Sequence, residues 1–299
     1  MSERGAAVAP WLFVPIWATG FVAARLAMPH APPLSFLSWR FALSALSLML
    51  WLAISRPPWP RRAGRLDWRG LGHVAFTGLL MQVGYLGGVW TAVRWGMGAG
   101  LIAIIVGLQP VITAAWLHLR GQEAVRATQW LGLALGLAGV ALAVGHKLGQ
   151  GEVTLGSGAV ALGALAAITI GTLYQKVHVP AMDVRVAQWV QMVAAFAAMA
   201  PLSWLETGGL GWRPQHWHPD LAVALGWSVL GLTLGGSSLL FWLIARGAAM
   251  RVTSLLYLVP PTTALMAWAL FREPLGPHVI LALALTAAGV WLVNRRGPR

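Results

Sequence analysis

The 299-residue sequence contains no cysteine and very little charge. Without cysteine, the chain can form neither disulfides nor thiolate metal sites, although this absence does not define its compartment. Charged residues make up 10% of the chain and hydrophobic residues 58%, whereas roughly a quarter of the residues in a soluble domain are charged. Most of the surface must therefore face lipid, and a soluble protein is excluded.

Acidic residues are particularly scarce, numbering eight against 21 Lys and Arg. All eight fall in expected loops or at expected helix ends, at Glu3, Asp67, Glu123, Glu152, Asp183, Glu206, Asp220 and Glu273. No carboxylate is therefore expected in mid-membrane for a proton relay or a sodium site. This absence favours facilitated diffusion, exchange or an unconventional proton path over a carboxylate-coupled pump.

Ten apolar segments are close to the length of about 20 residues that a helix needs to cross a bilayer. They lie at roughly 8–27, 35–54, 71–92, 99–118, 129–146, 155–175, 186–204, 220–244, 252–271 and 277–294. The expected fold class is an all-α membrane protein with ten transmembrane helices. The lipid bilayer is therefore its first expected partner.

Basic residues predict how these spans are oriented. The segment 55–70 contains five arginines against one acidic residue, Asp67. Placing that segment in the cytoplasm puts 15 of the 21 Lys and Arg on the same side, as the positive-inside rule requires. Both termini are then cytoplasmic, and the expected location is a bacterial-type inner (plasma) membrane. The net charge of +13 is thus explained by orientation signals, and no nucleic-acid partner is expected.

The second half of the chain repeats the first at a spacing of 150 residues. Pro110 pairs with Pro260, Glu123 with Glu273, and 14 of 46 paired positions between 99–144 and 249–294 are identical. Five spans separate equivalent positions, and because five is odd the second copy must cross the membrane inverted. Two inverted five-helix repeats around a central cavity are a common basis for alternating access in transporters.

Two pairs of motifs carry a family resemblance. The stretch 15–25, PIWATGFVAAR, with 38–41, SWRF, resembles the opening of the EamA family of the drug/metabolite transporter (DMT) superfamily. The segments 119–123, LRGQE, and 270–274, LFREP, are similar to its paired repeat endings. The resemblance implies repeats at 11–145 (spans 1–5) and 155–294 (spans 6–10), peripheral spans 5 and 10, and transport of a small-molecule metabolite. An exporter of an amino acid or related compound is the expectation.

Matched helix breaks are the candidate gating elements, because transporter sites lie where paired helices are interrupted. A proline inside a helix removes one backbone hydrogen bond, and such breaks persist where they line a cavity. The alternative is that these residues merely kink a helix or permit close helix contact. The candidates are Gly87 and Gly88 in span 3, Gly107 and Pro110 in span 4, Gly235 and Gly236 in span 8, and Pro260 and Pro261 in span 9.

Polar and aromatic residues inside the spans are the candidates for substrate binding. They are Trp17, Arg40, Tyr85, Gln109, Gln188 and Tyr257. For the glutamines and tyrosines, hydrogen bonding between helices is the competing role. For Arg40, the guanidinium either holds a substrate carboxylate through a two-pronged contact or extends to the surface.

Two other classes of protein remain as alternatives. An intramembrane enzyme, such as a transferase or a protease, needs carboxylate pairs, a histidine cluster or an activated nucleophile. The close pair His216 and His218, followed by Asp220, lies in an expected loop and lacks a further metal ligand. No catalytic residue, metal or cofactor is therefore expected. A non-transporting scaffold predicts no central cavity, and both a monomer and a homodimer stay open.

Overall fold

The computed structural model describes residues 3–120, 127–149, 153–208, 218–239 and 258–294. Nearly all of these residues are helical, and a short antiparallel hairpin joins the second and third spans. The elements of the first half are α1 (Glu3–Ala27), α2 (Pro33–Ser55), β1 (Arg61–Arg62), β2 (Arg65–Leu66), α3 (Trp68–Gly78), η1 (Leu79–Leu86), α4 (Gly87–Arg94), α5 (Ala99–Val106), α6 (Gln109–Leu119) and α7 (Ala127–Gly149).

The second half follows the same plan. Its described elements are α8 (Leu155–His178), α9 (Val184–Thr207), α10 (Pro219–Gly226), η3 (Trp227–Gly236), α13 (Val259–Phe271) and α14 (Pro277–Asn294). Within the described residues, five continuous helical segments are long and apolar enough to span a membrane, and five shorter apolar helices fall in the remaining expected spans. The all-α membrane fold predicted from hydropathy is confirmed.

Local sequence signals explain where several helices begin and end. Thr154 and Ser157 form a reciprocal capping box at the start of α8, which satisfies N–H groups that a helix start leaves unpaired. Proline occupies the first turn of α2 and of α10, where its missing N–H costs nothing. Gly208 ends α9 with φ of 68°, a left-handed conformation that glycine adopts without a side-chain clash.

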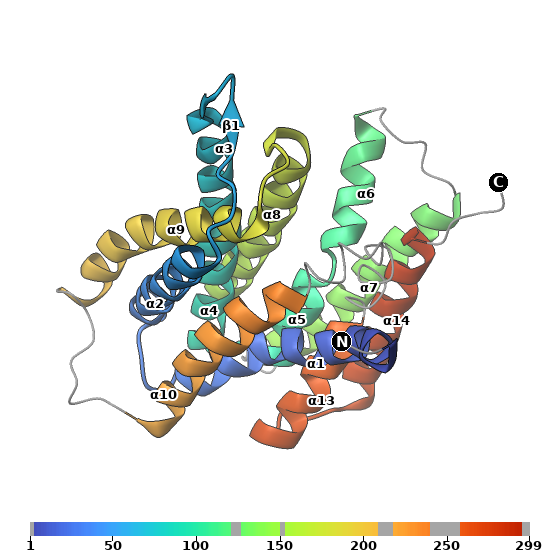
Figure 1. Ribbon diagram of the computed structural model, residues 1–299. Helices are drawn as coiled ribbons and strands as arrows, with labels where there is room; N and C mark the ends of the chain where they lie inside the picture. The colour runs from blue at the N-terminus through green and yellow to red at the C-terminus, as the bar shows by residue number, and fades with distance from the viewer. Residues whose placement is uncertain (1–2, 121–126, 150–152, 209–217, 240–257, 295–299) are drawn as a thin grey trace.

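Contacts between helices reproduce the twofold relation expected from the repeat. Helix α2 packs on its counterpart α9, and α7 packs on its counterpart α14. Helix α1 contacts α13 and η3, just as α8 contacts α5, α6 and η1. The pair α7 and α14 lies at one side of the bundle, at the right of Figure 1, whereas α2 and α9 lie at the left. The predicted peripheral position of spans 5 and 10 agrees with this arrangement.

Small residues allow α7 and α14 to pack closely. A Cβ atom added at Gly289 would lie 2.5 Å from the carbonyl oxygen of Gly132 and 2.6 Å from the amide nitrogen of Gly136. A Cβ at the paired position, Gly139, would lie 2.7 Å from the carbonyl oxygen of Ala282. These neighbours are backbone atoms that cannot rotate away, so glycine is needed for the two helices to approach.

Gly289→Ala is therefore expected to destabilise the protein by about 1–3 kcal/mol, the usual cost of overpacking. The measurement is the unfolding temperature of the purified protein in detergent. Gly145→Ala is the matched control, because it makes the same change in α7 where no atom lies within 4 Å of the added Cβ. Equal unfolding temperatures for the two variants would contradict the assigned packing role.

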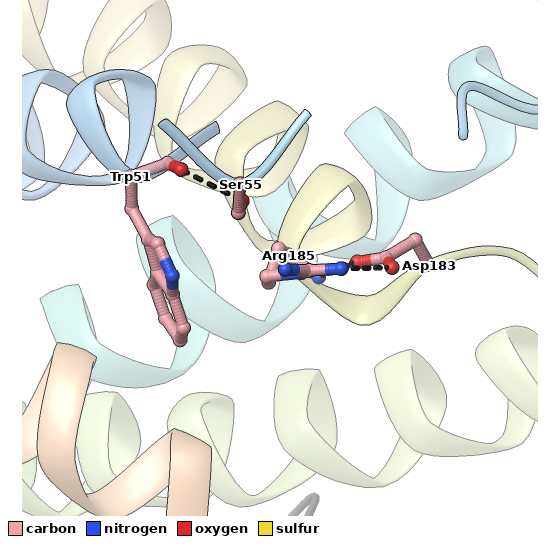
Figure 2. Close-up of polar contacts among 4 residues, drawn as sticks. All are labelled: Trp51, Ser55, Asp183 and Arg185. Carbon is pink, nitrogen blue, oxygen red and sulfur yellow. Dashed lines mark hydrogen bonds and ion pairs between the residues drawn. The ribbon is translucent and has the colours of Figure 1, made fainter. Parts of the chain in front are cut away.

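The adjoining ends of α2 and α9 carry their own polar contacts. Figure 2 shows Ser55 in the last turn of α2, where its hydroxyl donates to the Trp51 carbonyl at 2.7 Å. Asp183 caps α9 by accepting from the Arg185 backbone N–H at 2.9 Å and pairs with the Arg185 guanidinium at 2.7 Å. The side-chain hydrogen bond from Arg185 holds the pKa of the Asp183 carboxyl below its usual range. Its stabilising effect is thus present above the usual carboxyl pKa and is lost as pH falls through the lowered value.

Candidate functional site

A cavity of about 570 Å³ lies between the two halves of the bundle. Three spans of each half contribute to its lining, which are α1, α2 and η1–α4 from the first half and α8, α9 and η3 from the second. Aromatic and aliphatic side chains make up much of its wall, and Gln82, Gln188 and Gln191 add uncharged polar groups. The described lining contains no Asp, Glu or His. This composition suits an amphipathic small molecule.

The two paired spans that face this cavity are wound as π-helix at matching positions. The segment η1 covers Leu79–Leu86 and η3 covers Trp227–Gly236, so each lies about 150 residues from the other. Their residues Met81, Tyr85 and Thr233 line the cavity. π-helical segments are rare and occur often at functional sites. Neither hydropathy nor helix propensity signals this winding. The only local sign of an irregularity is a pair of glycines in each span, Gly87–Gly88 directly after η1 and Gly235–Gly236 at the end of η3.

Arg40 lies on the cavity wall, about two turns into α2. Only 8% of its surface is exposed, and its buried Nε has no hydrogen-bond partner among the described residues. The guanidinium carbon lies 5.9 Å from the centre of the Trp90 ring, close enough for a cation–π contact. Trp90 in turn stacks on Phe36 with ring centres 4.5 Å apart.

Four of the predicted substrate-binding residues line this one cavity, which are Trp17, Arg40, Tyr85 and Gln188. Gln188 is buried, and its side-chain amide donates to the Thr233 carbonyl of η3 at 2.9 Å. Gln109 is placed elsewhere, and its amide donates to the Thr172 hydroxyl of α8 at 3.1 Å. Hydrogen bonding between helices, the competing role for the glutamines, thus accounts for the contact of Gln109. Tyr257 lies outside the described residues.

The break residues of spans 4 and 9 meet each other and do not line this cavity. The chain leaves α5 at Gly107 and re-enters a helix at Gln109, while Pro260 occupies the first turn of α13 with Pro261 beside it. A Cβ at Gly107 would lie 3.0 Å from the Pro260 ring. Pro110, in the first turn of α6, lies outside the cavity lining as well. Their gating role stays a prediction.

The glycines of spans 3 and 8 allow close helix contacts around the cavity. A Cβ at Gly88 would lie 2.8 Å from the Ala164 Cβ of α8, and one at Gly236 would lie 3.3 Å from Ile16 of α1. Gly87 faces Met199 at 3.6 Å, an ordinary contact distance. Gly235 is exposed, and the nearest atom to its added Cβ is the Leu230 carbonyl oxygen at 3.3 Å.

Polar contacts between helix ends hold one end of the bundle together. We call it the Glu273 end, and it comprises loops 28–32, 95–98 and 272–276. The Glu273 carboxylate accepts from the Ala99 and Gly100 backbone N–H groups at 3.1 and 3.5 Å. It also lies 3.6 Å from Arg25 Nε at the end of α1. Glu273 thus joins the end of α13 to the start of α5 and to α1, which tightens contact between the halves.

The opposite end, which we call the hairpin end, comprises β1–β2 and loop 179–183. Its loop residues 179–182 belong to the cavity lining. Next to it, the His73 imidazole and the Tyr174 hydroxyl are 2.7 Å apart, and the Tyr174 ring stacks on His178 with centres 4.2 Å apart. Their pairing came from the fold, since His73 and Tyr174 are 101 residues apart.

A three-residue cluster at the Glu273 end was missed by the sequence reasoning. In the sequence, His218 and Asp220 lack a third metal ligand, whereas the structure brings His30 beside them. The His30 and His218 rings stack with centres 3.8 Å apart, and each has a nitrogen within 3.6 Å of the Asp220 carboxylate. This spacing suits a metal ion geometrically, but the side chains are partly exposed. His216 lies outside the described residues.

Comparison with known proteins agrees with this architecture. The sequence profile of the EamA-like transporter family matches residues 8–145 and 156–295. The uncharacterized transporter YvbV of Bacillus subtilis is 24% identical over 295 residues, which cover 94% of this chain and 88% of that protein. The uncharacterized inner membrane transporter YedA of Escherichia coli K12 is 26% identical over 287 residues, covering 93% and 87%.

A Salmonella typhimurium protein named a probable amino-acid metabolite efflux pump is 24% identical over 289 residues, covering 94% of this chain and 92% of that one. A solved structure titled only as that of a protein has the same fold, with a TM-score of 0.59, 17% identity and 98% coverage of both chains. Since the profile matches span both halves, the family predicted from the paired motifs is confirmed. The chain is a membrane protein of the EamA-like transporter family, within the drug/metabolite transporter superfamily.

Proposed function

We propose that this protein exports a small amphipathic metabolite, such as an amino acid or a related compound, across the inner membrane by alternating access. The observation that carries this proposal is the cavity of about 570 Å³ lined by three spans from each half. A cavity at the interface of inverted repeats is where transporters of this type hold substrate. The name of the Salmonella relative supports the amino-acid class.

The position of the cavity fits entry of substrate from one end of the bundle. Its lining reaches loop 179–182 at the hairpin end, whereas the Glu273 end is joined by the Glu273 contacts and by an Arg94 hydrogen bond to the Met28 carbonyl. By the positive-inside rule, the arginine-rich segment 55–70 favours a cytoplasmic position for the hairpin end. With that orientation, substrate would enter the cavity from the cytoplasm, which is the first step of export.

The two rival classes receive less support from the cavity. An enzyme site needs an acid–base pair or an activated nucleophile, and the described lining offers neither carboxylate nor imidazole. The names of the relatives point to transporters as well. A scaffold needs no cavity between its repeats, so the cavity weighs against that alternative.

The test is flux into proteoliposomes containing the purified full-length protein. The probes are isotope-labelled amino acids and their N-acetyl derivatives, supplied one at a time, with empty liposomes as the control. Time-dependent, saturable movement of at least one probe is the expected result. Flux equal to that of empty liposomes across the whole panel would overturn the proposal.

A further inference from the structure

Arg40 presents a buried cation without a counter-charge in the described cavity. Its side chain is 8% exposed and lines the cavity, and its buried Nε is unpartnered among the described residues. An arginine stays protonated in proteins, so the charge is permanent. Burying an unpaired ionised group is costly, and such a group inside a transporter marks a substrate pathway by default.

The carboxylate of Glu206, in the last turn of α9, contacts the start of α2 and is already engaged. The Glu206 carboxylate accepts from the Ser35 backbone N–H at 3.0 Å and from the Ser35 hydroxyl at 3.3 Å. The described cavity lining contributes no other carboxylate to balance Arg40. Trp90 offers only the face of its ring, at 5.9 Å, and the buried Nε has no acceptor among the described residues. The guanidinium can therefore bind another acceptor.

The chemistry of the cavity limits the class of that acceptor. A guanidinium fork matches a planar carboxylate through two parallel hydrogen bonds. Arg40 is the buried cation of the described lining, and the other lining cation, Lys176, is exposed. One buried cation balances one negative charge, which suits a monoanion better than a phosphate dianion. The remaining wall is largely apolar and aromatic, including Trp17, Met81 and Leu232. No described lining carboxylate is present to pair with a substrate ammonium group.

We propose that Arg40 binds the carboxylate of the substrate, and that the cavity selects amphipathic monocarboxylates over zwitterionic amino acids. This inference rests on the transport function proposed above. A zwitterion would bring its ammonium group into a cavity that already carries a positive charge, and would lose part of that group's hydration. A monocarboxylate with the same apolar part has no such penalty.

The test compares four ligands that share one aromatic side chain. They are N-acetyl-L-phenylalanine (monoanion), L-phenylalanine (zwitterion), L-phenylalaninamide (cation) and N-acetyl-L-phenylalanine methyl ester (neutral). Binding to the purified protein in detergent is measured by equilibrium dialysis. The monoanion is expected to bind at least about tenfold more tightly than each of the other three. This factor is the scale of a charge-assisted bidentate contact.

Variants then assign the preference to Arg40. Arg40→Gln is expected to lose about tenfold or more in affinity for the monoanion, and Arg40→Lys to lose less because it keeps the charge without the fork. Arg69→Gln is the matched control, since it removes the same charge from an exposed site outside the cavity lining. Should Arg40→Gln fail to fold, the ligand series with the unmodified protein still decides the question.

The two proposals fail in different ways. Tighter binding of L-phenylalanine or of the methyl ester than of the monoanion would overturn the inference, as would unchanged monoanion affinity in Arg40→Gln. Flux of zwitterions that does not depend on Arg40 would leave transport intact and overturn the carboxylate role. Arg40-dependent binding of the monoanion without flux of any probe would support the site and overturn the transport function.

Discussion

Replacing Glu273 with alanine is expected to open the Glu273 end of the bundle. The carboxylate accepts from two N–H groups at the start of α5 and faces Arg25 on α1, so it holds the second half of the chain against the first. A helix start carries partial positive charge that favours a carboxylate there. Loss of these contacts should shift the equilibrium toward the outward-open state by about tenfold or more, since hydrogen bonds to charged groups contribute roughly 1.5–3 kcal/mol each.

The absence of native cysteine makes this prediction easy to measure. Ile104 is 1% exposed and, together with Glu273, lines a second cavity of about 340 Å³. In an Ile104→Cys background, Glu273→Ala should speed labelling by a membrane-impermeant maleimide from the outer side about tenfold. Glu273→Gln should have a smaller effect, because the amide oxygen still accepts a hydrogen bond.

The matched control for Glu273 is Asp67→Ala in the same cysteine background. Asp67 is also a carboxylate at a helix start, and accepts from the Gly70 backbone N–H at 3.0 Å, but it lies beside the hairpin. Its removal should leave labelling at position 104 unchanged. If both variants label alike, or if Glu273→Ala labels no faster than its parent, Glu273 does not hold this end closed.

Filling the cavity is expected to abolish transport. Gly20 of α1 lines the cavity, and a Cβ there would meet only Leu232 side-chain atoms at 3.8–4.0 Å. Gly20→Trp therefore has room to fold while its indole occupies space that a substrate needs. Flux of a transported probe into proteoliposomes should fall about tenfold or more, because a substrate must be enclosed within this cavity to cross.

Gly163→Trp provides the control for Gly20→Trp. Gly163 is an exposed position of α8, no atom lies within 4 Å of its added Cβ, and it is outside the cavity lining. The indole would then face outward from the bundle, and flux should stay close to that of the unmodified protein. Comparable flux from both variants would show that substrate does not pass through the cavity beside Gly20.

Part of the candidate site could be predicted from the sequence, because a charge within an apolar segment and residues paired between the repeats can be recognised there. Arg40 stands out because it lies within an apolar segment. An ionised side chain is costly there, so it either has a functional role or extends to the surface. The pairing of Gly107–Pro110 with Pro260 indicated where equivalent helices are interrupted. The structure does bring Gly107 against Pro260, but it places both outside the larger cavity.

Other parts of the site depend on contacts that no local pattern records. The π-helical winding of η1 and η3 arises in segments whose composition resembles that of any apolar helix. His30 meets His218 at a separation of 188 residues, and Arg40 faces Trp90 from a neighbouring helix. Which side chains share a wall is decided by how the helices rotate against each other, and hydropathy carries no information about that rotation.

The sequence by itself determined the class, the number of spans, the inverted repeat and the family. These follow from the lengths of the apolar segments, from the odd number of spans in each copy and from the paired motifs. All three can be read along the sequence without knowledge of contacts. Only the tertiary structure decided that Trp17, Arg40, Tyr85 and Gln188 face one cavity, and that Glu273 joins the two halves at one end. In a chain of apolar helices, hydrophobicity sets which segments enter the membrane, whereas close packing of small residues sets which faces meet.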